Sequence, residues 1–229
     1  MHLGQIKMFD FSPLIISLET ALLASVLTFF AGIFAAYAMS NYKGKFKGLV
    51  EALLTLPLVF PPTVTGFFLL FLFGKNGPLG KLLYQFGINI IFTKSAIIIA
   101  GAVVSFPLMY KTTIGAFEQI DENLINAAKT LGVSNFYVLR KVILPLAWPG
   151  IASGTVLSFM RAIGEFGATI MIAGNIPGQT QTIPIAIYYA VEGNETNLAI
   201  SYVGIVVVLS IFVLTGMSYI QFGKKRFKK

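Results

Sequence analysis

Two oppositely charged residues in one apolar stretch are the candidates for chemistry that stand out most in this chain. Arg161 and Glu165 are the only charged residues between Trp148 and Ala173. Insertion scales assign about 2.5–3.5 kcal/mol to such a residue at the centre of a membrane helix. Their i, i+4 spacing puts them on one helix face, where they can pair. The pattern favours a structural or gating ion pair, and the alternative is an arginine that coordinates an anionic substrate directly.

Prolines followed by hydroxyl side chains form a second candidate group. Pro61 and Pro62 stand within an apolar stretch, where proline removes backbone donors and breaks a helix. Non-helical backbone at membrane depth is tolerated only inside protein or along a water-filled cavity. Thr63 and Thr65 follow and could offer hydroxyls to a passing oxyanion, and Ser105, close to another proline, is a weaker candidate. The alternative is a kinked packing helix whose threonines bond to their own carbonyls.

The composition indicates what must position these residues. Of 229 residues, 56% are hydrophobic and 11% are charged, against roughly 25% charged in soluble domains. A membrane protein is therefore expected. The chain has no cysteine, which excludes disulfides and thiolate metal sites. A correctly spaced phosphate loop is absent, as are metal-ligand spacings and catalytic pairs, so we expect no enzyme activity and no cofactor in this chain.

Apolar runs predict an all-α polytopic membrane protein with five transmembrane helices in a single domain, residues 1–229. About 20 apolar residues suffice for one crossing. The predicted spans are about 11–40, 49–73, 95–117, 148–173 and 197–222. Within the fourth, small residues recur every four positions, which is typical of tightly packed membrane helices: Gly150, Gly154, Ser158 and Ala162.

Basic residues predict the orientation. Three lysines lie in residues 41–48, four basic residues in 111–141 and five after Gly223, which makes twelve on one side of the predicted membrane. Four lysines lie on the other side. The positive-inside rule then places the N-terminus outside and the C-terminus in the cytoplasm of an inner or plasma membrane. The net charge of +8 is thus explained by orientation, and no nucleic-acid partner is expected.

The polar stretch of residues 118–145 reads as a cytoplasmic helix–turn–helix. Asp121 is a plausible N-cap of the first helix, and Ser134 of the second. Gly132 fits the left-handed position that stops the first helix, and Pro145 is expected to end the second. Small alanines beside the turn would let another protein approach closely. The alternative is an amphipathic hairpin that lies on its own membrane helices.

The same stretch resembles the EAA loop of ABC-importer permeases. Asn126-Ala127-Ala128 is followed by three residues, Gly132, nine residues, and then Val142-Ile143-Leu144-Pro145. Two positions depart from the family pattern, because Asn126 stands where glutamate is usual and Val142 where isoleucine is usual. The resemblance implies a coupling helix seated in a groove of the ATP-binding subunit. The implied coupling residues are Asn126, Ala127, Ala128, Gly132, Leu144 and Pro145.

Residues 54–80, 105–111 and 161–188 are similar to the molybdate permeases of the ABC family, and sulfate and tungstate permeases share much of the pattern. The resemblance implies the permease subunit of an ATP-driven molybdate importer, with the path between two copies. The implied partners are a second copy, two ATP-binding subunits that hold ATP and Mg, an external oxyanion-binding protein and membrane lipid. Tungstate or sulfate is the alternative substrate. An ATP-independent channel or secondary transporter is a distant alternative, because no clear inverted repeat and only one mid-span acid are present.

Overall fold

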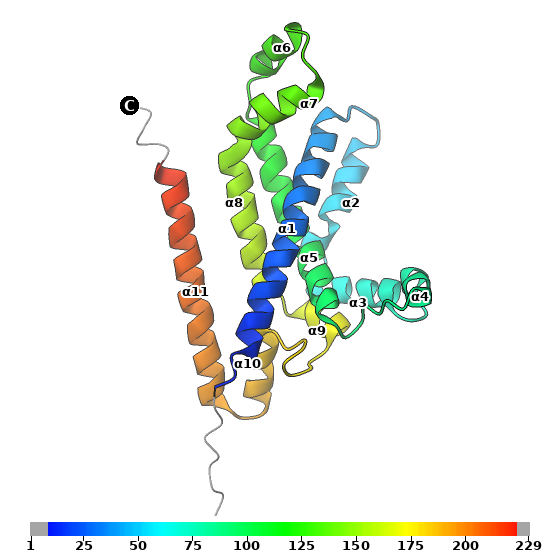
Figure 1. Ribbon diagram of the computed structural model, residues 1–229, viewed down its shortest axis with the longest axis vertical. Helices are drawn as coiled ribbons and strands as arrows, with labels where there is room; N and C mark the ends of the chain where they lie inside the picture. Colours follow the sequence, from blue (N-terminus) through cyan, green and yellow to red (C-terminus); the bar gives the residue numbers. More distant parts are fainter. Residues whose placement is uncertain (1–8, 224–229) are drawn as a thin grey trace, which may run out of the picture.

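Three long helices form the centre of the molecule. The computed structural model describes residues 9–223, with side chains to residue 216, and every regular element in that part is helical. Helices α1 (Ser12–Asn41), α5 (Lys94–Glu118) and α8 (Leu144–Ile163) pack on one another along their lengths (Figure 1). Helices α1 and α5 match the predicted spans 11–40 and 95–117 to within one residue at each end.

Small residues let these helices approach. A Cβ on Gly154 of α8 would lie 3.1 Å from the Met109 sulfur of α5. A Cβ on Gly150 would lie 2.4 Å from the Ala116 side chain, also on α5. The four-residue ladder predicted on this segment therefore packs against α5 of the same chain.

The predicted span 49–73 is broken at its prolines, where the sequence predicted an interruption of the helix. It consists of α2 (Lys47–Val59) and α3 (Pro62–Phe73), whose axes differ by 111°. The reason is the Pro61-Pro62 pair: proline has no N–H and forces the preceding residue out of the helical region. Phe60 accordingly adopts extended backbone angles. Four helices in the described residues are long and apolar enough to cross a membrane, and the bent pair provides a fifth if it counts as one span.

The predicted span 148–173 also needs correction. Helix α8 ends at Ile163, and after a break at residues 164–166 the chain continues as α9 (Gly167–Ala173). At its other end the helix begins earlier than predicted. Helix α7 (Asn135–Val138), the π-helical turn η1 (Leu139–Ile143) and α8 follow one another without interruption.

Pro145 does not end the second hairpin helix, contrary to the prediction. It is the second residue of α8, and the helix continues to Ile163. Proline lacks the N–H of an α-helical hydrogen bond and crowds the carbonyl one turn back. The preceding π turn, in which the Leu144 N–H bonds to the Leu139 carbonyl, widens the helix where the proline must fit.

The remaining helices lie around this centre. Helix α4 (Pro78–Gln85) extends from α3, and α10 (Ile183–Glu192) precedes α11 (Thr196–Gly223), which contains the predicted span 197–222. Helix α11 packs chiefly on α10, and its carboxyl-terminal part stands apart from the bundle in the view of Figure 1. Its exposed Val208 and Phe212 suit a lipid or protein neighbour.

Candidate translocation path and coupling surface

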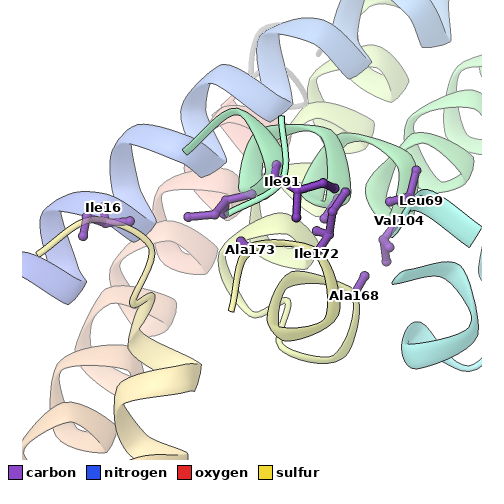
Figure 2. Packing of buried hydrophobic residues seen from close by; sticks show 10 residues of the cluster. Ile16, Leu69, Ile91, Val104, Ala168, Ile172 and Ala173 are labelled. Atoms are coloured by element: carbon purple, nitrogen blue, oxygen red, sulfur yellow. The ribbon is translucent and has the colours of Figure 1, made fainter. Parts of the chain in front are cut away.

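The two helix breaks of the membrane region are brought together. Helix α3 packs on α9, and each helix contributes a glycine to the contact. A Cβ on Gly66 would lie 2.8 Å from the Ala168 Cα, and one on Gly167 would lie 2.9 Å from the Pro62 Cβ. Figure 2 shows the adjoining core, where Leu69 of α3 and Ala168 and Ile172 of α9 gather with Val104 of α5. The first turn of α9 is buried in this contact, whereas Pro61, Pro62 and Gly164 at the breaks remain exposed, and exposed irregular backbone at membrane depth must border a second protein surface or a water-filled path.

The predicted pair of Arg161 and Glu165 forms at the second break. Arg161 Nη1 lies 2.5 Å from Glu165 Oε2, and Glu165 Oε1 accepts a hydrogen bond from the Ala168 N–H at 2.8 Å. Glu165 is only 2% exposed, so its carboxylate needs both partners. The Arg161 side chain remains 31% exposed. The pair thus ties the end of α8 to the first turn of α9 and leaves part of one guanidinium accessible.

The hydroxyl candidates divide into two sets. Thr63 is exposed in the first turn of α3, beside Pro61 and Pro62 at the bend. Thr65 is buried, and its hydroxyl has no hydrogen-bond partner in the part of the chain that the structure describes. The alternative reading, a threonine bonded to its own helix carbonyl, therefore does not apply to Thr65.

Ser105 lies apart from this set. It is fully buried where α5 meets α8, and its hydroxyl donates to the Ala102 carbonyl at 3.4 Å. Its own carbonyl accepts a hydrogen bond from the Ser158 hydroxyl, also at 3.4 Å. The structure places Ser105 in the packing of α5 on α8, and its role at the path stays a prediction.

The predicted helix–turn–helix is present, and local contacts define its shape. Helix α6 (Glu122–Thr130) is capped by the Asp121 carboxylate, which accepts from the Asn123 N–H at 2.9 Å. Gly132 follows at φ +72°, the left-handed conformation expected of it. The Ser134 hydroxyl caps α7 by accepting from the Tyr137 N–H at 3.2 Å. These turn and cap predictions are confirmed.

One face of α6 is apolar and points outward. Helix α6 has no buried residue, and Leu124 and Leu131 are 51% and 80% exposed. Ala127 is exposed beside them and Ala128 is half-buried. Exposed apolar side chains around small residues are typical of a protein-docking surface. The alternative of a hairpin that buries its apolar face on its own helices does not fit this exposure.

The other predicted coupling residues lie elsewhere on the hairpin. Asn126 lines a cavity of about 420 Å³ on the inner side of α6, together with Glu122 and Lys129. Leu144 packs partly buried against the core at the start of α8, and Pro145 is exposed next to it. The six residues therefore share no single surface. No sequence pattern indicated the cavity, because Lys43 and Lys47, which also line it, were interpreted only as markers of topology.

The described residues contain no group of three or more histidine, cysteine or acidic side chains that could hold a metal ion. The arrangement is a bend in α2–α3 that packs on α9, an Arg161–Glu165 pair that holds α9 to the end of α8, and an exposed apolar hairpin at the other end of that helical path.

Comparisons with known proteins agree with this arrangement. The chain is 42% identical over 205 residues to the putative molybdenum transport system permease protein YvgM of Bacillus subtilis (strain 168), covering 89% of this chain and 90% of the relative. It is 42% identical to the molybdenum transport system permease protein ModB of Escherichia coli (strain K12), covering 83% and 84%. A probable sulfate transport system permease protein cysT of Chlorokybus atmophyticus is 32% identical, covering 92% and 73%.

Solved structures share the fold. The MetNI methionine ABC transporter, in an inward-facing conformation, aligns with a TM-score of 0.71 over 92% of this chain and 94% of that chain, at 16% identity. Residues 28–226 match the family described as binding-protein-dependent transport system inner membrane component. A chain with this match, this all-helical fold and these relatives belongs to that family, the transmembrane permease subunits of ABC importers.

Proposed function

We propose that this chain is the permease subunit of an ATP-driven molybdate importer. The observation that carries the proposal is the continuous helical path from Asn135 to Ile163, which joins the exposed hairpin to the Arg161–Glu165 pair. The substrate is inferred from the relatives named as molybdenum permeases, which are more similar to this chain than the sulfate relative is.

Family membership makes the chain a multi-pass inner-membrane protein that works with ATP-binding subunits and a substrate-binding protein and is not itself catalytic. In the proposed assembly, two ATP-binding subunits hold ATP and Mg²⁺ and dock on the α6 face that contains Leu124, Ala127 and Leu131. Burial of this exposed face would stabilise the contact by about 25 cal/mol per Å² of apolar surface.

The helical path from Asn135 to Ile163 is 29 residues long, or about 40 Å at 1.5 Å per residue. Movement of the hairpin by the ATPases would therefore displace the Arg161 end of α8. Since Glu165 is bonded to both Arg161 and Ala168, that displacement would reach α9 and the α3 bend packed on it. Coupling by this route requires two arrangements of the same packed elements.

The substrate path is proposed to run between two copies, because so few helices in one chain would hardly enclose a gated channel. At the break, the accessible part of the Arg161 guanidinium would attract an oxyanion, and the exposed Thr63 would supply an uncharged donor; the buried Thr65 would do so only in another arrangement of the bend. The Glu165 carboxylate would not repel the anion strongly while it is paired and buried.

The orientation is proposed as N-terminus outside and C-terminus in the cytoplasm. Supporting it, the hairpin and the lysine-bearing α1–α2 connection lie at the same end of the bundle (Figure 1). The five basic residues after Gly223, counted for the same side, lie outside the described residues.

Reconstitution tests the proposal. The permease would be placed in vesicles with its ATP-binding subunits and binding protein, and uptake of labelled molybdate would be measured with ATP inside. We expect ATP-dependent uptake that excess tungstate suppresses and excess sulfate does not. Sulfate uptake that is unaffected by molybdate would show that the substrate is sulfate and not molybdate. Molybdate uptake without ATP would overturn the proposed ATP-driven mechanism.

A further inference from the structure

The cavity behind α6 has the size and place of a ligand site at the membrane surface. Its volume of about 420 Å³ is within the usual range of small-molecule sites, roughly 300–1,000 Å³. It lies where α1 ends at Asn41 and α5 ends at Glu118, between these helix ends and the hairpin. Neither the coupling surface on the outer face of α6 nor the break near Arg161 includes it.

Charges of both signs line this cavity. The basic residues are Lys43, Lys47 and Lys129, and the acidic residues are Glu118 and Glu122. Within residues 9–223, one ion pair involves a charged residue of this lining. Lys47 lies 3.9 Å from Glu51, and Glu51 does not line the cavity. Among the described residues, no ion pair joins a lysine of this lining to Glu118 or Glu122.

The acidic and basic residues of the lining come from several elements. Glu118 ends α5 and Glu122 begins α6, so the two carboxylates mark the junction of these helices. Lys43 lies in the α1–α2 connection, Lys47 is the first residue of α2, and Lys129 lies about 10 Å further along α6 than Glu122. Charges of both signs from several elements thus line the cavity, with the amides of Asn126 and Asn135 also in its lining.

We propose that this cavity binds the headgroup of an aminophospholipid. The lysines would hold the phosphodiester through charge-assisted hydrogen bonds, and Glu118 and Glu122 would accept from the primary ammonium. Carboxylates would repel a simple anion, and lysines a simple cation, whereas a zwitterion satisfies both sets. Basic pockets at the cytoplasmic surface are suited to lipid headgroups.

A path for the acyl chains adjoins the cavity. Tyr37 of α1 is in its lining, and Phe34, one helical turn further into the membrane on the same side of α1, is 74% exposed. A headgroup held in the cavity would let its chains lie along this apolar surface. The bound lipid would then join the α1–α2 connection to α6, none of whose own residues is buried.

Lipid retention tests the proposal without any transport measurement. The permease–ATPase complex would be equilibrated with vesicles of equal parts phosphatidylethanolamine, phosphatidylcholine and phosphatidylglycerol, and bound lipids counted by native mass spectrometry. We expect phosphatidylethanolamine to be enriched about tenfold over phosphatidylcholine, whose quaternary ammonium cannot donate to a carboxylate. Equal retention of the three lipids would overturn the proposal.

Charge variants locate the site. The double variant Lys43→Ala/Lys129→Ala should retain about tenfold less phosphatidylethanolamine than the native protein does. Glu118→Gln/Glu122→Gln should remove the preference over phosphatidylcholine. Lys45→Ala, in the same connection but outside the lining, is the matched control and should bind as the native protein does. Unchanged enrichment in both double variants would contradict the assignment.

A competition experiment distinguishes a bound lipid from a soluble molecule that carries the same charged groups. Glycerophosphoethanolamine, which carries the same phosphodiester and ammonium without acyl chains, would be added as a competitor. If the lipid is the ligand, this competitor should displace it weakly, because it lacks the contact along α1. Displacement at concentrations comparable to those of the lipid would assign the site to a soluble zwitterion and overturn the lipid proposal.

Discussion

At the scale of single residues, Gly132 gives the sharpest test of the hairpin. Its φ of +72° is costly for other residues, and a Cβ there would meet no atom within 4 Å. Gly132→Val should therefore impose about 1–3 kcal/mol of backbone strain without a clash. We expect normal insertion with weakened ATPase binding and loss of ATP-driven uptake, measured by pull-down and transport at matched permease levels.

Gly132→Asn is the matched control, because asparagine tolerates the left-handed region better than other non-glycine residues. It should retain most binding and uptake. If Gly132→Val behaved like the native protein in both assays, the turn would have no part in coupling.

The Arg161–Glu165 pair belongs to the same scale. Removing one partner of a fully buried pair costs about 3–5 kcal/mol, and less is expected here because Arg161 is 31% exposed. Glu165→Gln and Arg161→Gln should each lower the thermal stability of the detergent-solubilised protein. The double variant should lose less than the sum of the two, with a coupling of about 0.5–3 kcal/mol. Strictly additive losses would show that the pair does not act as a unit.

At the scale of helices, the close contact of α3 and α9 depends on Gly66. An added methyl group would lie 2.7 Å from the Met171 Cβ and 2.8 Å from the Ala168 Cα, and the latter belongs to the backbone and cannot turn away. Gly66→Ala should destabilise the protein by about 1–3 kcal/mol, the usual effect of overpacking. Thermal unfolding in detergent measures it.

Gly204→Ala provides the comparison, since a Cβ there meets nothing within 4 Å. In the middle of α11 it should be neutral or slightly stabilising, because alanine favours the helix. Equal unfolding temperatures for the two variants would mean that α3 and α9 can separate freely.

How much of each helix the sequence predicts depends on how local its determinants are. Caps and turns at Asp121, Gly132 and Ser134 involve neighbours within three residues, and all were predictable. The break at residues 164–166 contains no proline that would indicate it. Of the two Glu165 contacts that stabilise the break, the sequence predicted the pair with Arg161 but not the hydrogen bond from the Ala168 N–H. The prediction that Pro145 ends the second hairpin helix failed because a π turn accommodates the proline. No simple residue pattern predicts a π turn.

At the scale of the whole molecule, hydropathy predicted the helical membrane class well, but not what meets across the fold. The burial of Ser105 and the cavity behind α6 both depend on contacts between distant segments. Periodicity along one helix does not reveal which neighbour will cover it. For the same reason, Asn126 could be assigned to the coupling stretch by resemblance but not to the inner face of α6.

The orientation makes a prediction at this scale. Cysteines introduced as Gly48→Cys and Gln179→Cys would lie in exposed positions on α2 and on the loop before α10. In intact cells, an impermeant thiol reagent should label Gln179→Cys readily and spare Gly48→Cys until the membrane is opened. The natural absence of cysteine gives an unreactive background. The reverse pattern of labelling would invert the orientation.

The self-contained caps of the hairpin have an evolutionary consequence. Because α6 and the turn after it are shaped by Asp121, Gly132 and Ser134, and no α6 side chain is buried, the outer face can change sequence without disturbing the membrane bundle. Selection for a particular motor and selection for a particular cargo then act on residues that do not touch. Lineages that exchange one ATPase for another need alter only a few exposed positions, while the substrate path is inherited intact.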